Sequence, residues 1–263
     1  RYRMHFSSEM PIEINALLFV PTENTELWGM GQMEPGVSLY CRNILIDDKP
    51  AGLLPEWLRF LRGVIDSADI PLNISRESMQ DSSLVRKLNR VVTKRFLKFL
   101  DGEAKDNTDK YREFYAKFGR FLKEGVVVDY EHREGLAKLL RFESSMTDPG
   151  TLTGFEDYVT RAKDGQGKIY YLTGADRASV EAGPYLEALK SRGLEVIYLL
   201  DTIDEYLLQH LREFEGKDLV SAASADLELE DDDSIVLEGT PLGESEMEGL
   251  CVFLKAELGD RVE

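Results

Sequence analysis

A stripe of large apolar side chains between residues 106 and 142 is the feature that most constrains the fold of this chain. Aromatic and leucine residues recur at steps of three or four: Tyr111, Phe114, Tyr115, Phe118, Phe121 and Leu122. This spacing places them on one face of a helix, and such a face is far more often packed core than a cofactor site. Leu136, Leu139 and Leu140 add a short apolar face. The sequence therefore predicts a helical connector over residues 106–142.

The residues before the connector predict a sheet covered by helices. Apolar and β-branched side chains cluster between turn signals in three segments, which we expect to be strands: Arg1–Phe6, Glu13–Val20 and Ser38–Ile46. Apolar residues at helical spacing predict helices over Leu54–Leu61 and Leu84–Phe99. We assign residues 1–105 to this larger unit.

Residues 143–225 predict a smaller α/β unit in which short strands alternate with helices. Strands are expected at Ile169–Leu172, Val196–Leu200 and Leu219–Val220, and helices at Thr153–Ala162, Tyr185–Lys190 and Ile203–Arg212. Alternation of this kind favours a small parallel sheet with right-handed crossovers. The glycines of Gly165-Gln166-Gly167 precede the first strand, whereas a dinucleotide-binding motif follows one. We therefore expect a protein-binding or structural role for this unit.

Charge is distributed unevenly along the 263 residues. The net charge of −17 argues against general nucleic-acid binding, and the uncharged runs are too short to span a bilayer. The segment Leu84–Phe99 nevertheless carries six basic residues and no acid, which fits either a solvated helix face or a docking surface for an acidic segment or another domain. Residues 226–248 hold ten acids and no Lys or Arg, which predicts a hydrated linker.

Histidine and cysteine give no metal or nucleophile pattern. His5, His132 and His210 are scattered, and Cys41 and Cys251 are isolated. The absence of a Walker A motif and of a Gly-x-Ser-x-Gly motif argues against a self-contained active site. Two cysteines suit a reducing compartment, and a start at Arg1 without Met or a signal-type segment predicts a fragment.

The stretch Ile70–Gln80 places Arg76 where a helix is expected to begin. Pro71 favours an extended lead-in, and Asn73 or Ser75 can cap the helix. Amide groups at a helix start and a guanidinium together suit phosphate oxygens. Two interpretations remain open, because Arg76 could instead pair with a neighbouring carboxylate.

A second candidate binding segment is Leu27-Trp28-Gly29-Met30-Gly31-Gln32-Met33. It combines bulky apolar side chains with flexible glycines, which predicts an adaptable loop with an apolar surface. The alternative is that Trp28 folds back onto the sheet and is buried there.

Six stretches carry a resemblance to a known family: Leu54–Ser67 running into Ile70–Gln80, Phe114–Gly119, Leu136–Phe142, Lys168–Gly174, Ile203–Tyr206 and Leu211–Lys217. They resemble, in the same order, the middle region of the heat-shock protein 90 chaperones, whose bacterial members are called HtpG. The resemblance covers Arg1 to about Leu229 and is specific.

The resemblance implies a fold of two αβα sandwich units joined by the helical connector, with residues 226–263 forming the acidic linker and the start of a C-terminal dimerisation region. It implies that Arg76 contacts the γ-phosphate of ATP held by a separate N-terminal domain, while Asn73 and Gln80 order the catalytic loop. Leu27, Trp28, Met30 and Met33 would contact client proteins.

The whole protein would then be an ATP-dependent chaperone that uses ATP and Mg²⁺, forms a homodimer and works in the cytoplasm. This fragment alone would hold neither cofactor and would be inactive as an ATPase. Apart from the resemblance, the residues themselves are compatible with two other functions. One is a stand-alone α/β enzyme that binds an anionic small molecule through Arg76, and the other is a protein-interaction scaffold built on the basic helix and the Trp28 loop.

Overall fold

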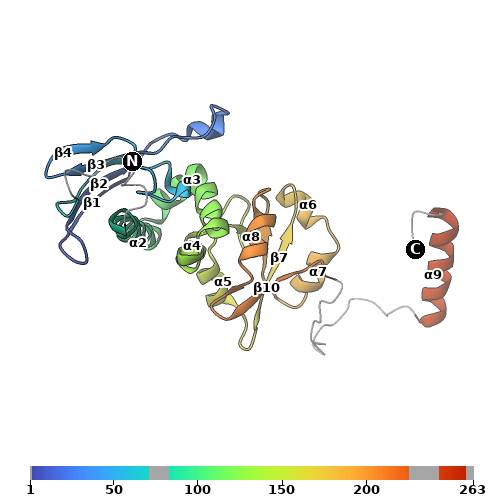
Figure 1. Ribbon diagram of the computed structural model, residues 1–263. Coiled ribbons are helices and arrows are strands. Elements are labelled where there is room, and N and C mark those ends of the chain that lie inside the picture. The colour runs from blue at the N-terminus through green and yellow to red at the C-terminus, as the bar shows by residue number, and fades with distance from the viewer. Residues whose placement is uncertain (1, 71–82, 225–242, 259–263) are drawn as a thin grey trace. The chain divides into compact units, whose positions relative to one another are not determined.

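The computed structural model describes residues 2–70, 83–224 and 243–258 (Figure 1). Contacts between residues divide the chain into two units, 1–227 and 228–263, and each is treated by itself below. The first unit contains two five-stranded sheets. The predicted α/β class with two sheet-containing parts is therefore confirmed, while the boundaries assigned to the four regions stay predictions.

The first sheet has the strand order β1-β2-β5-β3-β4. Its members are β1 (Tyr2–Ser8), β2 (Ile14–Val20), β3 (Gly36–Cys41), β4 (Ile44–Asp47) and β5 (Arg62–Asp66). Only β3 and β5 pair in parallel, and the other neighbours are antiparallel.

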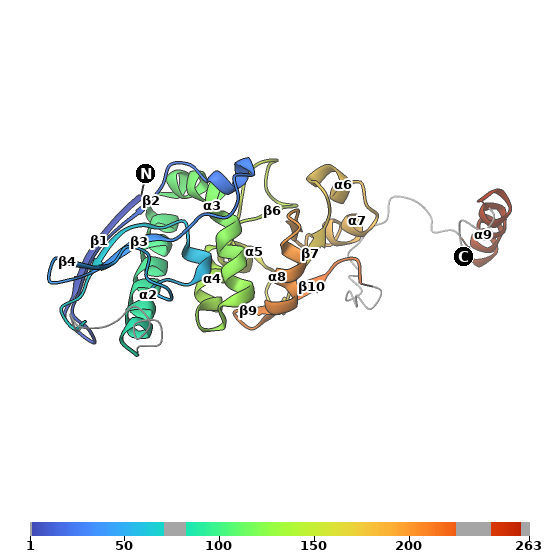
Figure 2. The same ribbon diagram turned by 45° about the horizontal axis from the view of Figure 1, so that its top comes forward.

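Alternation along β2 sets which face of this sheet is buried. Ile14, Ala16, Leu18 and Val20 are at most 2% exposed, as expected for side chains that alternate across a strand. They belong to one hydrophobic core with the inner face of helix α2 (Ser83–Asp106). The long helix predicted over the basic segment is confirmed, and in both ribbon views it lies beside the sheet (Figure 2).

Helices α3 (Thr108–Val128) and α4 (Arg133–Leu139) lie between the two sheets (Figures 1 and 2). All six residues of the aromatic stripe are buried, so the predicted packing role is confirmed. Phe60 lies with its ring centroid 5.0 Å from those of Phe118 and Phe121. Tyr111 donates a hydrogen bond of 2.6 Å to the Leu139 carbonyl and so joins α3 to the end of α4.

The second sheet has the order β6-β8-β7-β10-β9. The three central strands are parallel, as the alternating pattern predicted, and the two short edge strands are antiparallel. The strands are β6 (Glu143–Ser144), β7 (Lys168–Thr173), β8 (Val196–Leu199), β9 (Glu213–Phe214) and β10 (Lys217–Ser221), and the helices around them are α5 (Phe155–Arg161), α6 (Arg177–Glu181), α7 (Tyr185–Lys190) and α8 (Asp204–His210).

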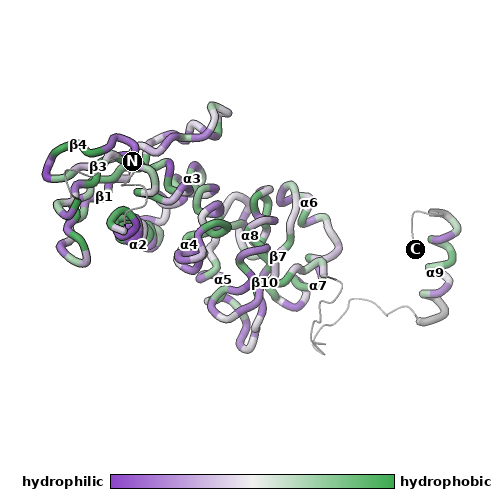
Figure 3. Tube along the Cα trace, in the orientation of Figure 1, coloured by the Kyte–Doolittle hydropathy of each residue, from purple (hydrophilic) through white to green (hydrophobic). Residues whose placement is uncertain are grey.

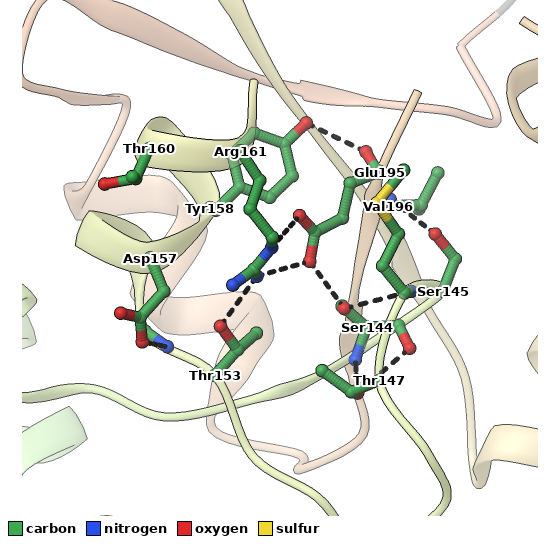
Figure 4. Close-up of polar contacts among 12 residues, drawn as sticks. Ser144, Ser145, Thr147, Thr153, Asp157, Tyr158, Thr160, Arg161, Glu195 and Val196 are labelled. Atoms are coloured by element: carbon green, nitrogen blue, oxygen red, sulfur yellow. Dashed lines mark hydrogen bonds and ion pairs between the residues drawn. The ribbon is translucent and has the colours of Figure 1, made fainter. Parts of the chain in front are cut away.

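A buried carboxylate ties β6, α5 and the start of β8 together (Figure 4). Glu195 is 4% exposed, and its oxygens accept hydrogen bonds from the Ser144 hydroxyl at 2.6 Å and from the Arg161 guanidinium at 2.8 and 3.0 Å. Tyr158 donates to the Glu195 carbonyl at 2.8 Å. Each oxygen of this buried acid therefore has a partner, so the network is structural.

The second unit contributes helix α9 (Glu244–Leu258). It carries both hydrophobic and hydrophilic residues (Figure 3), and within its described side chains Val252 and Phe253 are 70% and 60% exposed.

Two sequence predictions for residues 1–105 are wrong: one concerns a strand and the other a helix. The segment Ser38–Ile46 is two strands, because the chain reverses at Arg42 and Asn43, where φ is +49° and +65°. Both amides donate to the Asp66 carboxylate, at 2.9 and 2.7 Å, which stabilises a turn that contains no glycine. Within Leu54–Leu61, the structure has only a 3₁₀ turn, η2 (Glu56–Leu58), and the chain then enters β5.

Candidate functional site

The segment between β2 and β3 is attached to α3 by contacts of Asn24, Glu26 and Arg59, and these attachment points are called its base below. Asn24 is 3% exposed and caps the 3₁₀ turn η1 (Thr25–Trp28) by accepting a hydrogen bond of 3.0 Å from the Glu26 amide. Its side-chain amide donates to the Lys117 carbonyl on α3 at 2.7 Å. The start of the segment is therefore attached to α3.

A buried arginine provides the second attachment. Arg59, 6% exposed, donates from Nε and Nη2 to Glu26 at 2.8 and 2.9 Å, and from Nη1 to Glu124 of α3 at 2.6 Å. Its guanidinium also lies 4.4 Å from the centre of the Phe121 ring. Glu26 accepts the Met33 amide at 2.7 Å as well. These contacts hold both ends of the segment against α3.

Hydrogen-bond partners stabilise the ionised forms of Glu26 and Arg59 at this base. Burial of Glu26 favours its neutral form, but hydrogen bonds from Arg59 and the Met33 amide outweigh burial and lower the pKa of Glu26. Burial likewise opposes the charge of Arg59, yet the hydrogen bonds to Glu26 and Glu124 raise the pKa of its guanidinium. The base therefore carries a stable network of ionised groups.

The apolar side chains between these attachments point into solvent. Leu27, Trp28 and Met30 are 59%, 60% and 72% exposed, so Trp28 does not fold back onto the sheet. Met33 differs from them, because it is 7% exposed and belongs to the hydrophobic core. The structure thus brings three of the four predicted contact residues together on the surface and buries the fourth.

A groove of about 660 Å³ begins beside this base and was not predicted from the sequence. It is bounded by η2, the end of α3 and the start of α8, and its lining includes Gln32, Arg59, Glu124, Val128 and Tyr206. Val128 and Tyr206 are 69% and 59% exposed. Tyr206 lies in a stretch that carries the family resemblance, but its position near α3 depends on the tertiary fold.

A buried ion pair fixes α8, which supplies one wall of the groove. Lys123 of α3 lies 2.7 Å from an oxygen of Asp204, with side chains that are 10% and 1% exposed, and 3.7 Å from Asp201. Burial opposes the charge of Lys123, but interactions with Tyr115, Asp204 and Asp201 raise the pKa of its ammonium. Burial also raises the pKa of the Asp204 carboxyl. The charged Lys123 side chain therefore joins α3 of the helical connector to α8 of the smaller α/β unit.

The residues predicted to meet a phosphate, Arg76, Asn73 and Gln80, lie outside the described residues. The basic segment that follows them is part of α2, and all six of its cationic side chains are exposed: Arg86, Lys87, Arg90, Lys94, Arg95 and Lys98. Arg90 lies 3.2 Å from Glu131. Both interpretations of this basic face, solvated surface and docking surface, stay open.

Two other kinds of site are absent from the described residues. No group of three or more His, Cys, Asp or Glu side chains in that part of the chain could hold a metal ion. Among its helices, none is both long and apolar enough to cross a membrane. The described site therefore consists of exposed apolar side chains on a charged, anchored base, an arrangement suited to binding a polypeptide surface.

Comparison with known proteins decides the family. The Hsp90 protein family matches residues 2–263. The chain belongs to the Hsp90 family. It is 51% identical over 263 residues to the chaperone protein HtpG of Desulfotalea psychrophila and 52% identical over 260 residues to that of Desulfitobacterium hafniense; each match covers 99% of this chain and 42% of the relative.

Similarity extends to a mitochondrial heat shock protein. The mitochondrial heat shock protein 75 kDa of Bos taurus is 39% identical over 269 residues, which cover 100% of this chain and 38% of that protein. The predicted Hsp90 and HtpG resemblance is therefore confirmed. The chain spans about two fifths of the length of these relatives.

Proposed function

We propose that this chain is the middle segment of an ATP-dependent chaperone and that it contacts client proteins through Leu27, Trp28 and Met30. The observation that carries this proposal is the exposure of these three side chains above a base fixed by Arg59. Large apolar groups on a soluble surface commonly mark protein-binding sites. A fixed base lowers the conformational entropy that is lost when a partner binds.

The neighbouring groove supports the same function. Its lining joins apolar side chains, Val128 and Tyr206 among them, to the charged residues Arg120 and Glu124. An extended segment of a partly unfolded protein offers both apolar side chains and polar backbone groups. We therefore include Tyr206 among the proposed client contacts.

For the ATPase cycle, we propose that a separate N-terminal domain holds ATP together with Mg²⁺ and that Arg76 contacts the γ-phosphate of this ATP. Asn73 and Gln80 order the catalytic loop that carries Arg76. Support comes from family membership and from the chemistry of arginine, which stabilises charge on a transferring phosphoryl group. In this proposal the whole protein is a cytoplasmic homodimer, and the C-terminal part of this chain begins its dimerisation region.

The arginine proposal is tested in the whole protein. Arg76→Ala should slow ATP hydrolysis while nucleotide affinity changes little, because the arginine acts only after the domains have closed. The isolated chain should show no appreciable hydrolysis. Unchanged turnover in a folded Arg76→Ala variant would remove Arg76 from this role.

The client proposal is tested with Trp28→Ser combined with Met30→Ser. The variant should bind a partly unfolded protein more weakly at an almost unchanged melting temperature, because neither side chain is buried. Tyr206→Ser, tested separately, should weaken the same binding if the groove takes part. A large loss of stability, or full client affinity in a stable variant, would contradict the client-contact role.

A further inference from the structure

A second cavity, of about 290 Å³, lies where the junction of α2 and α3 meets the end of α4 and the residues leading into α5. It does not share a lining residue with the groove of the candidate functional site. Its lining is rich in charge, with four cations and three carboxylates: Lys105, Arg112, Lys138 and Arg141, and Asp101, Glu156 and Asp157. We propose that this cavity binds a small phosphate anion.

Arg141 is held in place without a carboxylate partner. Its Nη1 donates to the carbonyls of Lys138 and Leu140 at 2.9 and 2.8 Å, and its guanidinium lies 5.0 Å from the centre of the Tyr111 ring. Within the described residues, Arg141 forms no ion pair, and its Nε and Nη2 donate no hydrogen bond to protein. A guanidinium that is fixed in position and has free donors matches the oxygens of a phosphate.

Because Gly154 has no side chain, the guanidinium of Arg141 has room beside it. A Cβ atom at Gly154 would lie 2.9 Å from Nη1 and 3.3 Å from the central carbon of the guanidinium. Gly154 thus allows close approach of Arg141 to the loop before α5, and any side chain there would displace the guanidinium.

Two lysines add positive charge from other elements. Lys105 of α2 lies 3.0 Å from Asp101, and Lys138 of α4 lies 3.1 and 3.0 Å from Glu156 and Glu215. Each ammonium has three N–H donors, so these lysines can keep their partners and still reach an anion.

The acids of the lining are already engaged. Asp101 and Glu156 pair with the two lysines, and Asp157 accepts the Gly154 amide at 3.1 Å. Arg112 pairs with Asp109 at 3.4 Å, so Arg141 is the one cation of the lining that has no ion-pair partner among the described residues. A phosphate dianion offers several oxygens to cations from three elements, which a planar carboxylate matches less well.

The proposal is tested by titrating the full 263-residue chain with inorganic phosphate. Calorimetry gives the dissociation constant, and thermal unfolding gives the accompanying rise in melting temperature, with sodium chloride as the control at matched ionic strength. Saturable phosphate binding, with a shift that chloride does not reproduce, supports the site. Equal shifts with both salts would overturn it.

Variants locate the binding. Arg141→Gln should weaken phosphate binding at least about tenfold, because a hydrogen-bonded charge is lost. Arg90→Gln removes an exposed arginine from another surface and should leave the dissociation constant unchanged. If Arg141→Gln does not fold, as judged by circular dichroism, Lys138→Gln replaces it, because the Lys138 side chain is 40% exposed. Wild-type affinity in the folded variant would refute the assignment.

Discussion

The guanidinium of Arg59 and the carboxylate of Glu26 form a two-point ion pair, with N–O distances of 2.8 and 2.9 Å. The pair joins the end of the 3₁₀ turn η2 to the segment that exposes Trp28. Because Arg59 also binds Glu124 of α3, the exposed segment and the helical connector share one anchor. Mobility of the segment should therefore depend on this pair.

Glu26→Gln should destabilise the protein by about 2 kcal/mol, because a charge-assisted hydrogen bond to a buried arginine is lost. Urea unfolding measures the free energy, and amide hydrogen exchange over residues 24–33 should become faster. The matched control is Glu34→Gln, since Glu34 pairs with Lys49 at an exposed position and contributes little. Equal effects of both substitutions would contradict the anchoring role.

The same carboxylate predicts a dependence of stability on pH. The pKa of Glu26 lies below its ordinary value of 4.5, so its contribution is complete above that value and is lost as pH falls through the folded-state pKa. The difference in unfolding free energy between wild type and Glu26→Gln should stay constant from about pH 7 to about pH 5 and then shrink. A difference that grows in acid would show that the sign is wrong.

Lys123→Met should cost about 3–5 kcal/mol, because it leaves the buried Asp204 carboxylate without its cation. Adding Asp204→Leu should restore most of the loss, since the unpaired charge is then removed as well. Urea unfolding of both single variants and the double variant completes the cycle. Additive losses in the double variant would show that the two side chains do not stabilise each other.

Two glycines should respond to alanine with opposite signs. Gly63→Ala places a Cβ 2.1 Å from the Leu17 carbonyl oxygen at a residue with φ +140°, so the β2–β5 pair must shift and the protein is destabilised by more than about 1 kcal/mol. Gly102 lies in α2 with no atom within 4 Å of an added Cβ, and Gly102→Ala should stabilise by about 0.5–1 kcal/mol. Thermal unfolding distinguishes the two.

Regular patterns allowed much of the fold to be predicted from the sequence. The aromatic stripe and the basic helix have a clear helical period, and both appear as helices in the structure. Strand β5 was missed because five residues that include Gly63 give little pattern. The turn at Arg42 and Asn43 was missed because its stabilising group, Asp66, is 23 and 24 residues away.

The candidate site could be predicted only in part for a similar reason. Composition suggested an apolar binding segment, and Leu27, Trp28 and Met30 are indeed exposed. Composition could not separate Met30 from Met33, because the burial of Met33 depends on packing against the core. The groove could not be predicted, since its walls come from α3 and α8, which are distant in sequence.

The most direct test of the account is to measure the affinity of Trp28→Ser/Met30→Ser for a partly unfolded protein. The control is Met10→Ser/Tyr185→Ser, which removes two other exposed apolar side chains, 84% and 51% exposed. We predict that the first pair weakens binding at least about tenfold, the control leaves it unchanged, and both melt near the wild-type temperature. Equal affinities for the two stable variants would contradict client binding by this segment.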